Sequence, residues 1–305
     1  MSQPATKTAH DQFKPFDGFT GKLLDRMFPE DNGTLAGFGL PWEKCAAIRF
    51  QPGELSVWSG INGHGKSLFL SQMMLEAMTQ GERVLIASFE MRPERTAERM
   101  VRQVLTYQTE DMNEAVEAMA WLSKRGLVNA NTGQMKAENL LSYMAEFAKE
   151  GVSQFVVDSL MKVGIDQDDY NGMSRFVNQL VTLAQRFNVH VHLVAHSKKQ
   201  EDETGTPGKF DVKGPAEITN LPDWVFALWR NKGKERIMWE YQNTGQLPKG
   251  KTILDMQDTP DAFFICDKSR DKGEEAEKRY GLFFHRESMQ YVGGRGHEPK
   301  RYFDI

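Results

Sequence analysis

A glycine-rich turn within residues 56–74, SVWSGINGHGKSLFLSQMM, constrains the fold more than any other feature of the chain. Gly60 is separated by four residues from the triplet Gly65-Lys66-Ser67, after an apolar run and before a segment with helical apolar spacing. Glycines let such a loop turn its N–H groups inward, where they and the start of the helix attract phosphate. The lysine reaches the β- and γ-phosphates, and the serine hydroxyl can hold Mg²⁺. The pattern predicts a phosphate-binding loop for ATP or another nucleoside triphosphate.

The nucleotide contacts are expected in this loop and in the first turn of its helix. The residues are Gly60, Asn62, Gly63, His64, Gly65, Lys66, Ser67 and Leu68. Lys66 is also expected to be catalytic, because its charge meets the phosphates that react.

Short apolar runs alternate with amphipathic segments through the rest of the chain. The runs predict strands at 55–60, 83–90, 154–160, 189–196, 224–230 and 262–268. The amphipathic segments predict helices at 67–80, 94–107, 112–124, 137–150 and 173–187. Alternation of this kind is typical of an α/β fold with a mainly parallel, twisted sheet and helices on both faces.

The chain is expected to hold one ATPase domain, residues 41–305, after a flexible N-terminal segment, residues 1–40. Within that segment, the apolar spacing of 19–28 predicts a short linker helix that packs either on its own domain or on another subunit. Two polar stretches rich in Gly and Pro interrupt the domain. Residues 198–215 are expected to form a mobile loop, and residues 242–261 a β-turn insertion.

Composition sets limits on location and partners. The formal net charge of the 305 residues is −4, so any contact with nucleic acid must come from a local basic patch. Two cysteines without metal-type spacing fit a reducing compartment. No apolar run approaches the roughly 18–20 residues that span a bilayer. A cytoplasmic protein without a membrane segment is therefore expected.

Three acidic or imidazole side chains lie at or near the C-terminal ends of predicted strands. Asp158 ends the run FVVD, Glu90 follows ASF, and His196 follows HLVA. Carboxyl ends of parallel strands meet at one edge of a sheet, so these side chains are expected near the phosphate-binding loop. There Asp158 could order Mg²⁺, Glu90 could polarise the attacking water, and His196 could touch the γ-phosphate. Two of them also have a structural interpretation, since Asp158 could cap a helix and Glu90 could be a solvated residue at a helix start.

The ordered set of the phosphate-binding loop, SFEM, VVDSL, LVAHSKK, DVKGPAEITNLPDWVFALWRN and DKSRDKG resembles the RecA-type helicase domain of DnaB-class replicative helicases. The similarity is greatest to phage primase-helicases and to the mitochondrial helicase Twinkle, which also carry a His at the position of His196. The resemblance extends from about residue 40 to residue 295 and implies a RecA-like P-loop NTPase core with a short N-terminal linker helix.

The resemblance also implies roles for single residues. Glu90 falls on the family's catalytic base, His196 on its phosphate sensor, and Ser67 and Asp158 on its magnesium site. Lys268 and Arg270 fall on a Lys-x-Arg pair that reaches into the neighbouring subunit's ATP site. Without the resemblance, this pair would be interpreted as surface charges on an edge strand. Arg230 falls on the arginine that stacks on the base, with an aromatic partner near Phe284 or His285.

The resemblance further implies a homo-oligomer, expected to be a hexameric ring that translocates on single-stranded DNA. The loop 198–215 falls where family members contact DNA, although a solvated charged loop is the other interpretation. Its candidate contacts are Lys198, Lys199, Lys209, Lys213 and Gly214. A primase or polymerase partner is expected from the same resemblance.

Two departures from the family and two rival functions remain open. About 40 residues precede the core, where relatives carry a primase, primase-like or helical domain, and the stretch at 233–261 is longer than expected. A RecA-type recombinase or regulatory ATPase that binds DNA without unwinding it is the main alternative. A small-molecule kinase fits less well, because no acceptor-binding lid is recognisable.

Overall fold

A computed structural model describes residues 15–21, 24, 37–130, 132–197, 208, 211–271 and 273–303. The chain divides into two compact units, residues 1–37 and residues 38–305. In the first unit a short 3₁₀ helix, η1, spans Phe16–Phe19, and residues 20, 21 and 24 are helical. The remaining residues of the linker helix predicted over 19–28 lie outside the described part of the chain.

The second unit is built on a large sheet, which has nine strands within the described residues. Their order is β11-β10-β9-β8-β3-β7-β6-β4-β5. Strands β8, β3, β7, β6, β4 and β5 run parallel to one another, and β9, β10 and β11 extend the sheet in antiparallel fashion. The predicted α/β fold with a mainly parallel sheet is confirmed.

Strands β3, β4, β6, β7, β8 and β9 follow the predicted apolar runs closely, whereas β5, β10 and β11 were not predicted. The parallel strands are β3 (Leu55–Ser59), β4 (Val84–Ser88), β5 (Gly126–Val128), β6 (Gln154–Asp158), β7 (His190–Val194) and β8 (Trp224–Arg230). The antiparallel strands are β9 (Ala262–Ser269), β10 (Lys278–His285) and β11 (Gln290–Val292). A two-stranded ribbon pairs β1 (Phe38–Gly39) with β2 (Arg49–Phe50).

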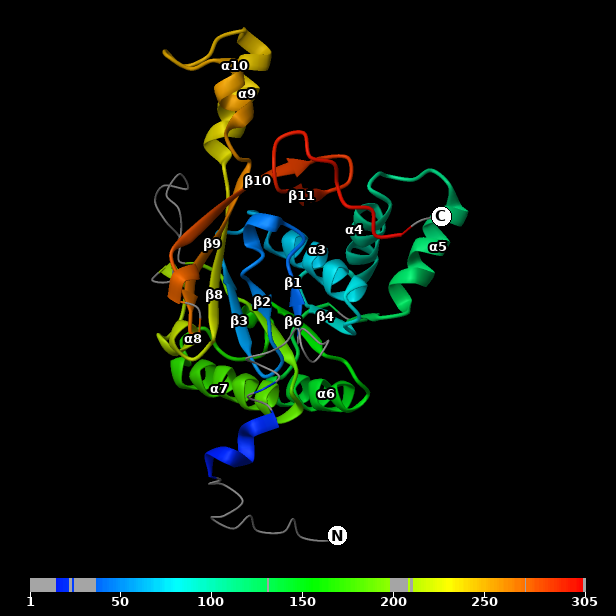
Figure 1. Cartoon of the computed structure of the whole chain (residues 1–305), viewed down its shortest axis with the longest axis vertical. Coiled ribbons are helices and arrows are strands. Elements are labelled where there is room, and N and C mark those ends of the chain that lie inside the picture. Colours follow the sequence, from blue (N-terminus) through cyan, green and yellow to red (C-terminus); the bar gives the residue numbers. More distant parts are fainter. Residues whose placement is uncertain are drawn as a thin grey trace. The chain divides into compact units, whose positions relative to one another are not determined.

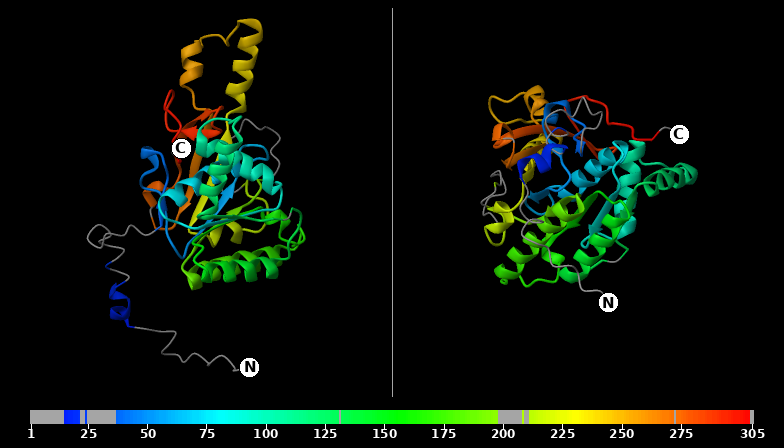
Figure 2. Two further views of the ribbon diagram at one scale, coloured as in Figure 1. Left: turned by 90° about the vertical axis from the view of Figure 1, so that its right-hand side faces the viewer. Right: turned by 60° about the horizontal axis from the view of Figure 1, so that its bottom comes forward.

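Helices cover both faces of the sheet (Figures 1 and 2). One face carries α3 (Lys66–Thr79), α4 (Pro93–Leu105), α5 (Met112–Ser123) and the β1–β2 ribbon. The other carries α6 (Ala137–Lys149), α7 (Tyr170–Phe187) and α8 (Glu217–Asn220).

Alternation along each central strand explains the two cores. Successive side chains of a strand point to opposite faces. In β3, Trp58 therefore packs in the cluster on the α3 face, whereas Leu55 and Val57 pack in the cluster on the α7 face. Because both faces are covered, the central strands have largely apolar sequences, which is the pattern that predicted them.

The β-turn insertion predicted at 242–261 is wrong. The chain there forms two helices, α9 (Lys232–Thr244) and α10 (Ile253–Asp258). The Asn231 side chain caps the start of α9, and Gly245 ends it in the left-handed conformation at φ 71°. A capping box between Thr252 and Asp255 starts α10. These caps were present in the sequence, but the Gly and Pro residues between the helices suggested turns.

Candidate nucleotide-binding site

The phosphate-binding loop joins β3 to α3, and its glycines have the backbone that the loop requires. Gly60 has φ +144° and Gly65 has φ +88°, both in the region that L side chains rarely adopt. A Cβ at Gly60 would collide with the carbonyl oxygen of Leu228, and a Cβ at Gly65 with the hydroxyl of Tyr291. Both positions therefore exclude a side chain on grounds of conformation and of space.

Lys66 folds back over this loop. Its Nζ donates to the carbonyl oxygens of Gly60, at 2.7 Å, and Ile61, at 3.1 Å. Burial lowers the pKa of Lys66, while the charges of Asp158 and Glu90 act to raise it. The ammonium thus lies inside the curve of the loop, where a triphosphate could replace its carbonyl partners.

Ser67 and Asp158 form the candidate magnesium site. The Ser67 hydroxyl donates to Asp158 Oδ2 at 2.5 Å, at the start of α3 and the end of β6. Burial raises the pKa of Asp158, partly offset by the Ser67 hydrogen bond. A hydroxyl and a carboxylate next to a phosphate loop suit Mg²⁺, which binds few protein oxygens and keeps its remaining positions for phosphate and water. The residues present fit that ion.

Glu90 and His196 meet through a residue that the sequence analysis missed. Ser159 Oγ donates to Glu90 Oε1 at 2.7 Å, and His196 Nε2 lies 3.1 Å from the same oxygen and 3.1 Å from Ser159 Oγ. The His196 hydrogen bond, assisted by Ser159, lowers the pKa of Glu90 to about 2 against the opposing effect of partial burial. The carboxylate is therefore ionised throughout the neutral range.

Arg99 is a second residue that sequence reasoning missed. It lies on α4 and lines a small cavity with Ser67 and Asp158. Burial lowers its pKa, and the charge of Asp158 acts to raise it. The motif that ends at Glu90 gave no signal for Arg99, because the residue is nine positions further along a helix.

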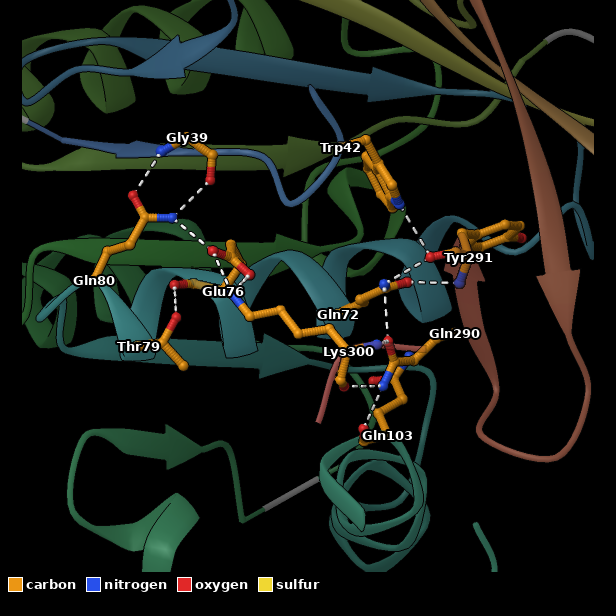
Figure 3. Close-up of polar contacts among 10 residues, drawn as sticks. All are labelled: Gly39, Trp42, Gln72, Glu76, Thr79, Gln80, Gln103, Gln290, Tyr291 and Lys300. Carbon is orange, nitrogen blue, oxygen red and sulfur yellow. Dashed lines mark hydrogen bonds and ion pairs between the residues drawn. The ribbon is translucent and has the colours of Figure 1, made fainter. Parts of the chain in front are cut away.

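The C-terminal strand is held beside the loop by buried glutamines (Figure 3). Gln72 of α3 accepts from the Tyr291 N–H at 2.8 Å and donates to the Tyr291 carbonyl at 2.9 Å. Trp42 Nε1 donates to the same carbonyl at 3.1 Å. Gln290 donates to the carbonyls of Gln103 and Lys300. This clamp brings Tyr291 against Gly65, although the two are far apart in sequence.

Arg230 and His285 line one cavity of about 1130 Å³, together with Phe284 and residues of α9. The Arg230 backbone N–H donates to His64 Nδ1 at 3.1 Å, which brings the end of β8 to the phosphate loop. The Arg230 guanidinium pairs with Glu235 of α9. The base-stacking role of Arg230 and His285 stays a prediction. A nucleotide base between them would have to occupy this shared cavity.

Lys268 and Arg270 lie at the other end of the sheet. Ser269 pairs with Trp224, the first residue of β8, whereas Gly60 follows the last residue of the parallel β3. Lys268 Nζ donates to the carbonyls of Thr219, Asn220 and Pro222. Arg270 donates to the Leu221 carbonyl at 2.7 Å and approaches Asp223 at 3.6 Å. The pair is thus remote from the phosphate loop of its own chain.

Most of the predicted DNA-binding set cannot be placed. Lys198, Lys199 and Lys209 lie outside the described residues. Lys213 donates from its backbone to the His196 carbonyl at 2.8 Å, and its Nζ donates to Gln167. A β-bridge joins Ser197 to Val212, and Gly214 follows at φ +123°. The two ends of the loop 198–215 are therefore joined next to His196.

A phosphate loop between β3 and α3, with acidic residues and a histidine after the neighbouring parallel strands, defines a P-loop NTPase domain of RecA type. Family comparison agrees, because residues 49–202 match the family model described as AAA domain. The chain belongs to this AAA domain family, and membership of the family implies that a nucleotide is bound.

Relatives of known structure or sequence confirm the resemblance predicted from the motifs. The chain is 23% identical over 232 residues to the chloroplastic/mitochondrial Twinkle homolog protein of Arabidopsis thaliana, covering 68% of this chain and 32% of that protein. It therefore spans about a third of the length of this relative. A solved DnaB-like replicative helicase matches with a TM-score of 0.68 at 14% identity, over 92% of this chain and 67% of the other.

A second solved structure, of an ATPase domain, matches with a TM-score of 0.65 at 16% identity, over 91% of this chain and 99% of that one. The molecule is thus a helicase-type NTPase domain in fold. Among the described residues, no helix is both long and apolar enough to cross a membrane.

Proposed function

We propose that the protein hydrolyses ATP, or another nucleoside triphosphate, to drive translocation of a ring of subunits along single-stranded DNA. The observation that carries this proposal is the convergence of five side chains at one edge of the sheet. They are Lys66, Ser67, Glu90, Asp158 and His196.

Each side chain has a task in hydrolysis. Lys66 moves from the loop carbonyls to the phosphates, and Glu90 accepts the proton of the attacking water because it is ionised at neutral pH. Ser67 and Asp158 would hold Mg²⁺, which neutralises phosphate charge when bound. His196, which lies beside Glu90, contacts the γ-phosphate.

We also propose that Lys268 and Arg270 act on the nucleotide of a neighbouring subunit. They lie at the sheet end opposite to the phosphate loop of their own chain, which supports a role at the site of another subunit. A head-to-tail contact that repeats in this way produces a ring or an open helix. We propose a hexameric ring, in which hydrolysis depends on assembly.

DNA contact is proposed for the loop 198–215, whose ends are joined next to His196 by the bridge from Ser197 to Val212. Because Lys213 bonds to the His196 carbonyl, movement of DNA at this loop can be transmitted to the γ-phosphate site. Few basic residues per subunit are enough if six subunits act together. A primase is the proposed protein partner, since the solved DnaB-like helicase is described with its interactions with primase. A cytoplasmic location is proposed with it.

Hydrolysis of ATP with and without single-stranded DNA tests this function, with the mass of the protein measured at the same concentrations. We expect strong stimulation by DNA at a mass near six subunits, and loss of turnover in Lys66→Ala. Unaltered turnover in Lys66→Ala would refute the phosphate-loop assignment. DNA-dependent hydrolysis by open filaments in electron micrographs would favour a DNA-binding ATPase that does not unwind.

A further inference from the structure

Ser159 connects the two side chains that were predicted to act at the γ-phosphate. Its hydroxyl, Glu90 Oε1 and His196 Nε2 lie within hydrogen-bond distance of one another, at 2.7, 3.1 and 3.1 Å. Ser159 is fully buried, whereas the Glu90 side chain is 40% exposed. The serine is therefore the rigid member of the group, and the glutamate is the member with conformational freedom.

The hydrogens of the group can be counted. The Ser159 hydroxyl has one proton, which it donates to Glu90 Oε1. The His196 Nδ1 is buried and has no hydrogen-bond partner among the described residues, so the tautomer with its proton on Nε2 satisfies the group best. Glu90 Oε1 then accepts from both residues, while no side-chain donor within the described residues is recorded for Oε2.

One proton on His196 Nε2 cannot serve Glu90 and a phosphate oxygen with equal strength. If His196 contacts the γ-phosphate, its hydrogen bond to Glu90 is weakened or lost. Ser159 then remains as the recorded donor to Oε1. A carboxylate anchored at Oε1 keeps Oε2 directed to one place, which is the requirement for a base that must meet a water in line with the γ-phosphate.

We propose that Ser159 is a positioning residue for hydrolysis, which holds Glu90 in place while His196 exchanges its hydrogen bond from Glu90 to the γ-phosphate. The inference rests on the proposed function, because it takes Glu90 as the base. Ser159 itself touches neither the nucleotide nor the water. Its backbone is fixed by a hydrogen bond from Lys162 N–H to the Ser159 carbonyl at 2.9 Å, so the hydroxyl has a stable origin.

Steady-state ATP hydrolysis by Ser159→Ala, in the presence of DNA, tests the proposal. We expect kcat per nucleotide-binding site to fall about tenfold, with KM changed by less than about twofold, because binding is retained and only the chemical step suffers. Counting sites by nucleotide-binding stoichiometry removes any contribution of unfolded protein. Ser159→Thr and Ser159→Val form a second pair of equal shape, in which only the threonine keeps a hydroxyl and should exceed the valine in kcat.

Ser56→Ala is the matched control. Ser56 is also a fully buried serine, and it also bonds to a histidine, at 2.7 Å from His190 Nε2. Ser56 is the second residue of β3 and therefore lies near the end of the sheet that is remote from the phosphate loop. The same loss of a buried hydroxyl should there leave kcat per site within about twofold of the unmodified protein.

The double variant Glu90→Gln/Ser159→Ala separates positioning from a general structural effect. If Ser159 acts through Glu90, the second substitution adds no further loss to that of Glu90→Gln. Equal kcat per site in Ser159→Ala and the unmodified protein, or fully additive losses, would overturn the inference while the proposed function stands. If ATP turnover of the Lys66→Ala variant equals that of the unmodified protein, the proposed function is overturned, and this inference with it.

Discussion

The parallel and antiparallel parts of the sheet contribute to the site in different ways. In the parallel part, the ends of β3, β4, β6 and β7 bring Lys66, Glu90, Asp158 and His196 to one edge of the sheet. In the antiparallel part, β9 carries Lys268 and Arg270 to the opposite end. The first part assembles the candidate nucleotide-binding site within one chain. The second part offers charges that this site cannot use.

This difference follows from strand direction. All carboxyl ends of parallel strands lie at one edge, so a residue after any such strand is near the others. A strand that reverses direction delivers its C-terminal residues to the other edge. A chain can therefore carry every motif of a family while two of the charged residues in those motifs, Lys268 and Arg270, lie away from its own phosphate loop.

Arg270→Ala should have the largest effect. It tests most directly whether the antiparallel part of the sheet serves the site of another subunit. We expect DNA-stimulated hydrolysis to fall by about 10³-fold, because an arginine supplied across an interface stabilises the charge of the transition state. Nucleotide binding should be retained, since Arg270 is remote from its own phosphate loop. Turnover and nucleotide affinity, measured on the same preparation, check both statements.

Mixing subunits gives the control for this variant. A Lys66→Ala subunit retains Arg270 and could supply it to an Arg270→Ala neighbour, whose phosphate loop is intact. Activity in the mixture of two inactive proteins is therefore expected. Arg279→Ala, on the adjacent β10, should have little effect. Failure of the mixture to recover any activity would argue that Arg270 acts within its own chain.

Gln72→Ala tests the clamp that joins the two parts. Gln72 is 1% exposed, and its removal leaves the buried N–H and carbonyl of Tyr291 without this partner. We expect the free energy of unfolding to fall by about 1–3 kcal/mol. Chemical denaturation measures it. Gln80→Ala, at the C-terminal cap of the same helix, removes a similar bidentate contact to Gly39 in a less buried place and should cost less.

Nucleotide turnover of Gln72→Ala tests whether the antiparallel part of the sheet also supports the phosphate loop. Since Tyr291 packs against Gly65, loosening β11 should also raise the KM for ATP. A loss of stability with an unchanged KM would mean that the clamp supports the fold but not the loop.

Arg230→Ala should have the smallest effect. Loss of a stacking cation at the base costs about 1 kcal/mol, which corresponds to roughly a fivefold increase in KM for the nucleotide. The kcat should change by less than about twofold, because the phosphates and Glu90 are unaffected. Arg236→Ala, an exposed arginine of α9 that lines the same cavity, is the control. A fall in kcat instead would place Arg230 in the hydrolytic machinery.

The accuracy of the predictions differs between the two parts for a physical reason. In the parallel part, strands β3, β4, β6, β7 and β8 and helices α3 to α7 were predicted to within about three residues at each end, because the buried strands are largely apolar and most helices have an apolar face. The short β5 and α8 were not predicted. The prediction was wrong at α9 and α10, where the Gly and Pro residues between two short helices outweighed the capping signals of Asn231 and Thr252.

The residues of the candidate site were also predicted only in part. Asp158, Glu90 and His196 were predicted because each follows a strand, and strand direction brought them together. Ser159 was missed, since a serine after a strand is common and only its contacts with Glu90 and His196 distinguish it. Arg99 was missed because it reaches Ser67 and Asp158 from the side of a helix.

Local sequence specifies the phosphate loop, the alternation of strands and helices, and the identity of the acidic residues and histidine at the strand ends. Neighbouring residues encode these features through backbone freedom and apolar periodicity. Three further features became visible only in the folded chain: β3 lies between β7 and β8, Ser159 links Glu90 to His196, and Arg270 lies away from its own loop. These depend on pairing between distant strands, which no local pattern specifies.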